Sequence, residues 1–154
     1  MLLTSCGVYS FKDVSIDYTK YKTIKINFIE NRAPIVNTQL APKLNDKLQQ
    51  KIVSQTKLTR TNNDDAHYQL SGFISTYNVT TTAISTTQAA TNRLTVGVHM
   101  VVKNTLENKT DEFDVSRNFD FSANLSIDQA YVQLQDEIIR NLTDEIFNHI
   151  FSNW

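Results

Sequence analysis

The feature that most constrains the fold is a wide apolar stripe over the last part of the chain. It follows Ser126-Ile127-Asp128-Gln129, a capping-box pattern in which Ser126 and Gln129 satisfy the first free backbone N–H groups of a helix. Asp128 also complements the helix dipole. The stripe has helical spacing and consists of Ala130, Tyr131, Leu134, Ile138, Ile139, Leu142, Ile146, Phe147, Ile150 and Phe151. It predicts a long helix that lies flat on a sheet.

A second amphipathic helix is predicted earlier in the chain. Leu40, Leu44, Leu48 and Ile52 recur four residues apart, with charged and amide residues between them. Pro42 is tolerated only near the first turn of a helix. We therefore expect this helix to begin within residues 38–41 and to end near residue 57.

Four segments alternate apolar and polar residues, as half-buried strands do. They are residues 23–29, 68–79, 94–103 and 113–121. In the second segment, Leu70 and Ile74 are expected on one face, and Phe73 and Tyr77 on the other. The third segment has the most regular alternation and is predicted to be a central strand. The fourth has the least regular pattern.

The order of these elements is strand, helix, strand, strand, strand, helix. The first strand-helix-strand unit favours a right-handed parallel crossover, and the following three strands favour an antiparallel meander. The predicted class is α+β, with two α-helices packed on one face of a mixed four-stranded sheet. Residues 80–91 are almost entirely Thr, Ser, Ala and Gln. They are predicted to form a long hairpin tip into which the strands partly extend.

Composition excludes several classes of function. The 154 residues are 40% hydrophobic, as expected of one domain with a real core, and the formal charge of -1 provides no basic surface for nucleic acid. The three histidines have no Cys, Asp or Glu partner at metal-ligand spacing, and no nucleophile-elbow or phosphate-loop motif is present. We expect no metal site, no catalytic residues and no nucleic-acid partner.

Cys6, the only cysteine, lies in Leu3-Thr4-Ser5-Cys6-Gly7, the pattern recognised in bacterial lipoprotein processing. We predict that Cys6 is lipidated, since acyl chains on one residue anchor a protein firmly to a membrane. An ordinary free cysteine near the chain start is the competing interpretation. Residues 1–5 are too short for a signal peptide and are interpreted as a remnant of one. Residues 6–22 are then the lipidated tether, and residues 23–154 a single α+β domain.

Five segments, in order along the chain, resemble LptE, the LPS-assembly lipoprotein family of Gram-negative outer membranes. They are Cys6-Gly7-Val8-Tyr9-Ser10-Phe11, Asn31-Arg32-Ala33-Pro34-Ile35-Val36-Asn37, Ser54-Gln55-Thr56-Lys57-Leu58, Asn92-Arg93-Leu94-Thr95-Val96 and Ile146-Phe147-Asn148-His149-Ile150-Phe151-Ser152-Asn153-Trp154. Together they cover nearly the whole chain.

The resemblance implies a non-enzymatic protein that plugs the LptD β-barrel, assists its assembly and helps LPS reach the outer leaflet. It also implies a location at the periplasmic side of the outer membrane, held by a lipid anchor such as palmitate on Cys6 and without another cofactor. Gly7 agrees with this location, because Asp at that position retains lipoproteins in the inner membrane of enteric bacteria. The alternative is a periplasm-facing adaptor or pilotin for another outer-membrane machine, such as a secretin. An enzyme with a dispersed site is a further alternative.

LPS presents phosphates and acyl chains, so a protein that binds it needs Arg or Lys beside an apolar surface. Arg32 and Arg93 lie in two of the matching segments and are the candidate LPS-binding residues. A purely structural role stays open for both. Arg32 would then brace the turn before Pro34, and Arg93 would be a polar residue at the start of a strand.

Overall fold

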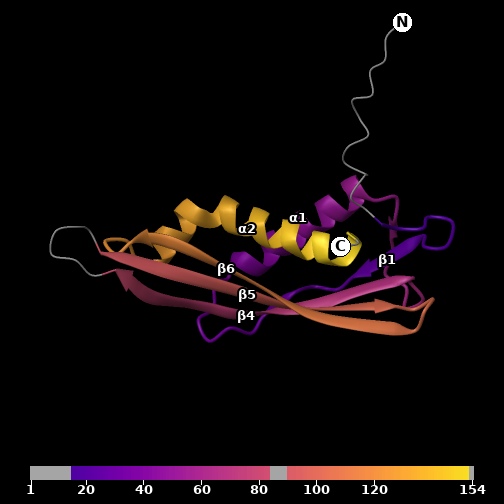
Figure 1. The fold of residues 1–154 in the computed structure, drawn as a ribbon, viewed down its shortest axis with the longest axis horizontal. Helices are drawn as coiled ribbons and strands as arrows, with labels where there is room; N and C mark the ends of the chain where they lie inside the picture. The colour runs from indigo at the N-terminus through magenta and orange to yellow at the C-terminus, as the bar shows by residue number, and fades with distance from the viewer. Residues whose placement is uncertain (1–14, 84–89, 153–154) are drawn as a thin grey trace, which may run out of the picture.

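Two helices lie on the same face of one mixed sheet (Figure 1). The computed structural model describes residues 15–83 and 90–152. Within these residues the elements are β1 (Thr23–Ile26), β2 (Glu30–Asn31), α1 (Leu40–Gln55), β3 (Thr59–Arg60), β4 (Tyr68–Ala83), β5 (Thr91–Asn104), β6 (Lys109–Ser122) and α2 (Ile127–Phe151). The predicted α+β class and the packing of both helices on one face are confirmed.

The sheet has six strands in the order β3-β1-β4-β5-β6, with β2 beside β4, rather than the four strands predicted. The additional strands β2 and β3 have two residues each, too few for alternation to reveal them. β1 and β4 are parallel across α1, whereas β4, β5 and β6 form an antiparallel meander, as predicted. β5 is hydrogen-bonded on both sides.

The helix boundaries follow from local hydrogen bonds. At the start of α2, Ser126 Oγ accepts from the Gln129 backbone N–H at 3.1 Å, and Gln129 Oε1 accepts from the Ser126 N–H at 2.9 Å. At the start of α1, Asn37 Oδ1 accepts from two backbone N–H groups, those of Gln39 and Leu40. Both predicted helices are therefore confirmed near their predicted ends.

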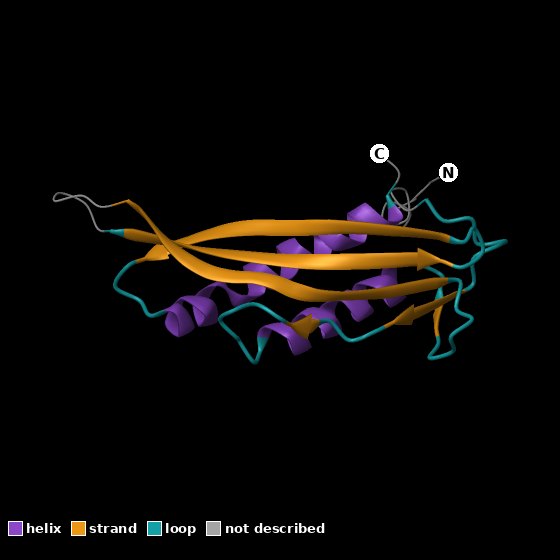
Figure 2. Ribbon diagram, turned by 90° about the horizontal axis from the view of Figure 1, so that it is seen from below, coloured by secondary structure: helices purple, strands orange, loops and turns teal. Residues whose placement is uncertain are grey.

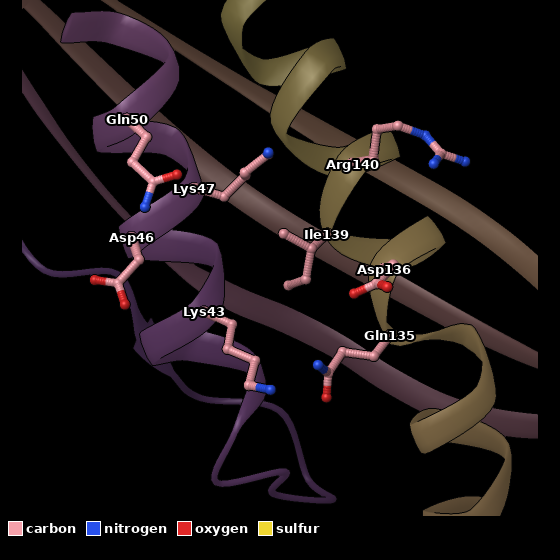
Figure 3. Close-up of a pocket in the computed structure, with 8 residues that line it drawn as sticks. All are labelled: Lys43, Asp46, Lys47, Gln50, Gln135, Asp136, Ile139 and Arg140. Carbon is pink, nitrogen blue, oxygen red and sulfur yellow. The ribbon is translucent and has the colours of Figure 1, made fainter. Parts of the chain in front are cut away.

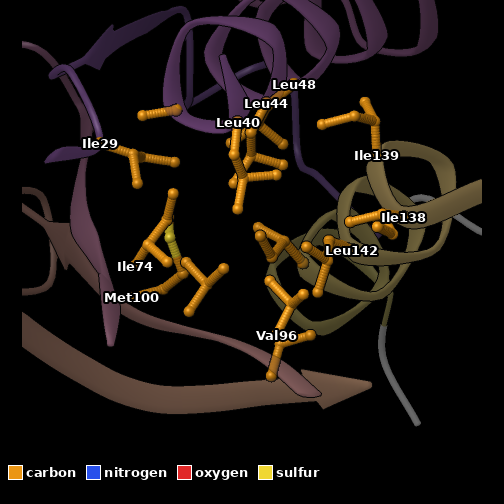
Figure 4. Close-up of a cluster of buried hydrophobic side chains, with 14 of the residues drawn as sticks. Ile29, Leu40, Leu44, Leu48, Ile74, Val96, Met100, Ile138, Ile139 and Leu142 are labelled. Atoms are coloured by element: carbon orange, nitrogen blue, oxygen red, sulfur yellow. The ribbon is translucent and has the colours of Figure 1, made fainter. Parts of the chain in front are cut away.

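The core lies between the helices and the sheet (Figure 4). The predicted stripes of both helices meet the helix-facing side of β5 there. Completely buried members are Leu40, Leu44, Leu48, Ile52, Leu94, Val96, Val98, Met100, Ile138, Leu142 and Ile146. Burial of so many Leu, Ile and Val side chains, each contributing about 1.5–3 kcal/mol before entropy, is the main stabilising term of the fold.

The placement predicted for Tyr77 is wrong. The register between β4 and β5 shifts between Ile74 and Thr76, so one additional residue of β4 is inserted at Ser75. This β-bulge reverses the alternation, because successive side chains of a strand point to opposite faces. Tyr77 therefore joins Ile74 in the core and is only 1% exposed.

Candidate functional site

The face of the sheet opposite the helices is open and carries many polar side chains. Figure 2 views the molecule from this side, with the strands in front of the helices. Alternation places Thr and Asn side chains on this open sheet face, and Thr95 Oγ1 donates to Asn118 Oδ1 across β5 and β6 at 2.8 Å. Neither α1 nor α2 covers this face, so a partner could reach it.

Arg93 lies on the open sheet face near the β4–β5 hairpin. Its Nε and Nη2 atoms donate to the two carboxylate oxygens of Asp120, at 2.7 and 3.2 Å, and the two residues are directly opposite in the β5–β6 register. The hydrogen bond from Arg93 lowers the pKa of Asp120, and the same bond raises the pKa of Arg93. The charge of Arg93 is thus balanced within the protein.

Arg32 begins a row of side chains that crosses the sheet. Its guanidinium lies 4.5 Å from the centre of the Phe73 ring, and its Nη2 is 3.5 Å from Glu30 Oε2. Phe73 contacts the His99 ring at 5.2 Å, and His99 Nδ1 lies 2.9 Å from Asp114 Oδ1. Together with Glu30, the row links β2, β4, β5 and β6. Its contacts form only because these strands are aligned in this register.

Exposed apolar side chains occur in the same connecting segments as Arg32. Phe28 is 57% exposed, Ile35 44% and Val36 61%. The loop containing the last two is held closed by Asn31, whose Nδ2 donates to the Asn37 carbonyl at 3.3 Å. Arg32 is thus a cation that stacks on one aromatic ring and lies close in sequence to exposed apolar side chains.

The structure does not bring the two predicted arginines together. Arg93 is in register with Thr80, seven positions along β4 from Phe73, the residue beneath Arg32. Seven strand residues span about 23 Å. Cys6 and residues 84–89 of the predicted hairpin tip lie outside the described residues. The rest of that tip, up to Ala83 and from Thr91, is paired strand, in agreement with the prediction that the strands extend partly into it.

A pocket of about 330 Å³ lies between the outer surfaces of α1 and α2. In Figure 3, Lys43 and Lys47 extend from α1 toward α2, whereas the guanidinium of Arg140 points away from α1. Asp136 also lines the pocket. Lys43 and Lys47 are four residues apart, a spacing that places both on one face of α1 and could have indicated this pocket from the sequence. The mixture of both signs of charge does not select a ligand class.

No metal site is assembled within residues 15–83 and 90–152. These residues contain no group of three or more His, Cys, Asp or Glu side chains placed to hold a metal ion. His67 Nδ1 accepts from the Lys22 N–H, and His149 stacks on Phe113 at 3.7 Å. Neither of the two helices has the length and apolarity needed to cross a membrane.

Comparison with known proteins gives one family and several similar folds. The model of a family described as "LptE: Lipopolysaccharide-assembly" matches residues 21–150. A homolog of a putative neuraminyllactose-binding hemagglutinin from Helicobacter pylori matches with TM-score 0.60 and 6% identity, over 88% of this chain and 87% of its own. No curated protein matches.

Two further solved structures are similar. A minor lipoprotein from Acinetobacter baumannii has TM-score 0.51 and 18% identity, covering 84% of this chain and 92% of its own. PelC from Paraburkholderia phytofirmans, solved as a dodecamer, has TM-score 0.53 and 10% identity, covering 87% and 89%. At such low identity these structures show a shared fold only.

Proposed function

Because the chain belongs to the LptE lipopolysaccharide-assembly family, we propose that it is a non-enzymatic lipoprotein of the LPS transport machinery and the plug and assembly partner of the LptD β-barrel. The observation that carries this proposal is the extent of the family match. Residues 21–150 include α1, all the strands of the described residues and nearly all of α2, so nearly the whole described fold belongs to the match.

The open sheet face supports a plug role through its chemistry. The lumen of a large membrane barrel is polar, and the Thr, Ser and Asn side chains of this face suit such surroundings. β4 has 16 residues and is therefore about 50 Å long, about twice the height of the apolar band of an outer-membrane barrel. A domain of this length would pass through the lumen.

Arg32 is the better supported of the two candidate LPS contacts. It stacks on Phe73 and shares its segment with exposed apolar side chains, whereas Arg93 is paired in a bidentate manner with Asp120. An amphiphile with phosphates and acyl chains needs both a cation and an apolar surface. Arg32 offers both at one place, and Arg93 would have to exchange Asp120 for phosphate.

A lipid anchor on Cys6 would place the domain at the periplasmic side of the outer membrane. Residues 15–22, interpreted above as part of the tether, contact the domain, since Ile16 and Tyr18 pack against the core. Residues 7–14 then connect the anchor to the domain.

The test is recovery of partners from outer membranes. The protein is expressed with a complete signal sequence and an affinity tag, and the membranes are solubilised in mild detergent. LptD is expected as the dominant barrel recovered. Recovery of a secretin or another machine in its place would contradict the proposal and favour the adaptor or pilotin reading.

A matched pair of variants tests the contact surface. Ser116 lies on the open sheet face, opposite Gly97, and Gln133 is exposed on α2. Ser116→Arg is expected to reduce LptD recovery because it places a long cation on the proposed contact face. Gln133→Arg introduces the same side chain on the helical layer and serves as the control.

A further inference from the structure

Both ends of the described chain meet at the pole of the domain opposite the β4–β5 hairpin (Figure 2). The Ser15 backbone N–H donates to the Phe151 carbonyl at 2.6 Å. Asn104 Nδ2 donates to the Tyr21 hydroxyl at 2.8 Å, which fixes the entering segment beside the turn between β5 and β6. Residues 15–22 and 103–109 therefore form one surface, here called the anchor pole.

The anchor pole is basic and has an exposed apolar tip. Lys20, Lys22, Lys103 and Lys109 are exposed, and none lies within ion-pair distance of a carboxylate of the described residues. The two segments contain these four lysines and two carboxylates, those of Asp17 and Glu107, and their net charge is +2.

The surroundings of the anchor pole carry both signs of charge. The adjoining loop of residues 57–67 has Lys57 and Arg60 against Asp64 and Asp65, and Asp64 pairs with Lys25. Two carboxylates follow Lys109 on β6, and they lie beside histidine rings: Asp111 is 3.3 Å from His149 Nε2 and Glu112 is 3.9 Å from His99 Nε2. At the opposite end of the sheet, by contrast, the charge of Arg93 is compensated by Asp120. The four lysines of the anchor pole, without an ion-pair partner among the described residues, thus lie together where the chain enters the domain.

Leu106 supplies the apolar component. It lies in the turn between β5 and β6 and is 50% exposed, with Lys103 and Lys109 three residues away on either side. A turn that combines an exposed Leu with flanking lysines matches a bilayer interface, where apolar groups enter the acyl boundary and cations contact anionic headgroups.

We propose that the anchor pole binds the anionic headgroup surface of a bilayer, with Leu106 at the interface. The position of the predicted lipid anchor determines this occupant. Cys6 is nine residues before Ser15, and nine extended residues span at most about 30 Å. The acyl chains would hold this pole, and no other, close to the membrane. The proposal rests on lipidation of Cys6 and is independent of LptD.

The consequence is a defined orientation. Acyl chains alone attach a domain without orienting it, whereas a basic surface beside the attachment point favours one orientation. Each lysine near an anionic surface strengthens membrane binding by about fivefold. β4 runs away from the anchor pole for about 50 Å, so the hairpin end would point away from the headgroups.

The test uses the full chain with Cys6→Ala, which removes the acyl contribution to binding. Sedimentation is measured with vesicles of phosphatidylcholine alone and of equal parts phosphatidylcholine and phosphatidylglycerol. Binding to the anionic vesicles only, weakening as salt is raised, is expected. Adding Lys103→Glu with Lys109→Glu should weaken it by about 30-fold or more, since two attractive charges become repulsive.

The control is Lys43→Glu with Lys47→Glu on α1, which makes the same change in net charge away from the anchor pole. It is expected to retain most of the binding. Leu106→Asp should weaken binding with little effect on thermal unfolding, because Leu106 is outside the core. Failure to bind anionic vesicles, or equal losses in the two double variants, would overturn the proposal. Neither result bears on LptD recovery, which is measured separately.

Discussion

The side-chain amide of Asn45 pairs with both backbone groups of Ile29. Asn45 Oδ1 accepts from the Ile29 N–H at 3.0 Å, and its Nδ2 donates to the Ile29 carbonyl at 3.2 Å and to the Ala41 carbonyl at 2.8 Å. Asn45 is 3% exposed and Ile29 1%. A side chain of α1 thus acts as a strand partner for Ile29, the buried residue between β1 and β2.

Asn45→Ala is therefore expected to be strongly destabilising. It leaves a buried N–H and a buried carbonyl without partners, and each costs about 1–3 kcal/mol. We expect the free energy of unfolding, measured by urea denaturation, to fall by about 2–5 kcal/mol. Gln50→Ala, on the exposed side of the same helix, is the control and should change it by under about 0.5 kcal/mol.

Asn45→Asp tests the donor half of this arrangement. An ionised Asp still accepts from Ile29 but faces two carbonyl oxygens, which raises the pKa of the new carboxyl in the folded state. A raised folded pKa gives stability that is present at acid pH and lost as pH rises through it. The variant should be closer to wild type in acid than at neutral pH. A pH-independent deficit would contradict this role.

Gly72→Ala is expected to destabilise through overpacking. A Cβ at Gly72 would clash with the backbone carbonyl oxygen of His99, which cannot move without disturbing the ladder, and would lie 2.7 Å from Met100 Sδ. We expect a loss of about 1–3 kcal/mol in urea denaturation. At Gly97 the nearest atoms belong to the Thr76 and Ser75 side chains, at 3.1–3.3 Å. Gly97→Ala should therefore be milder, and the reverse order would contradict the argument.

Tyr131 gives a prediction for alkaline unfolding. Burial, with a smaller contribution from Tyr77, raises the pKa of Tyr131 to about 12, and its hydroxyl has no hydrogen-bond partner among the described residues. The unfolded phenol ionises near pH 10. Stability is therefore complete below about pH 10 and declines as pH rises through about 12.

Tyr131→Phe should reduce this alkaline decline, because the buried ionisable group is absent. At neutral pH it should cost little, since it removes an unpaired hydroxyl rather than a hydrogen bond. Unfolding free energy measured across the alkaline range decides the point. A decline as steep as that of wild type would show that Tyr131 does not contribute.

Charge reversal separates the two candidate LPS contacts. Arg32→Glu is expected to reduce binding of purified LPS by at least about tenfold, since it removes a stacked cation and places a carboxylate beside Glu30. Arg93→Glu should reduce it less, because Asp120 already balances that charge. Arg140→Glu on α2 is the matched control. A loss for Arg140→Glu as large as for Arg32→Glu would indicate a general charge effect.

Lipidation of Cys6 is tested directly by mass spectrometry. When the protein is expressed with a complete signal sequence, we expect the mature chain to begin at Cys6 with acyl chains attached. Cys6→Ala should release a folded protein from the membrane fraction. An unacylated mature protein would refute the lipoprotein assignment.

The core could be predicted from sequence because burial there follows local spacing. The stripes of α1 and α2 and the alternation of β5 are each set by neighbours within a few residues. Asn45 was missed because a polar residue inside a helical pattern is assigned to the solvent side. Tyr77 was missed because a single inserted residue reverses alternation, and no sequence signal marks the insertion at Ser75.

The candidate site was less predictable because it depends on register. Arg93 and Asp120 are 27 residues apart, and the row from Arg32 through Phe73 to His99 forms only when three strands align. Sequence similarity selected the two arginines. Only the structure shows that Arg32 stacks on Phe73 beside Glu30, whereas Arg93 is held by both carboxylate oxygens of Asp120.

The hydrogen bond between Ser15 and Phe151 also makes the fold suited to circular permutation. A short linker could join the two ends, and the chain could be opened between Ala83 and Thr91. Strand pairing from Tyr68 to Asn104 would be preserved, but the new start of the chain would lie at the hairpin end. A lipid attached there would invert the domain on its membrane, separating the effect of attachment from that of orientation.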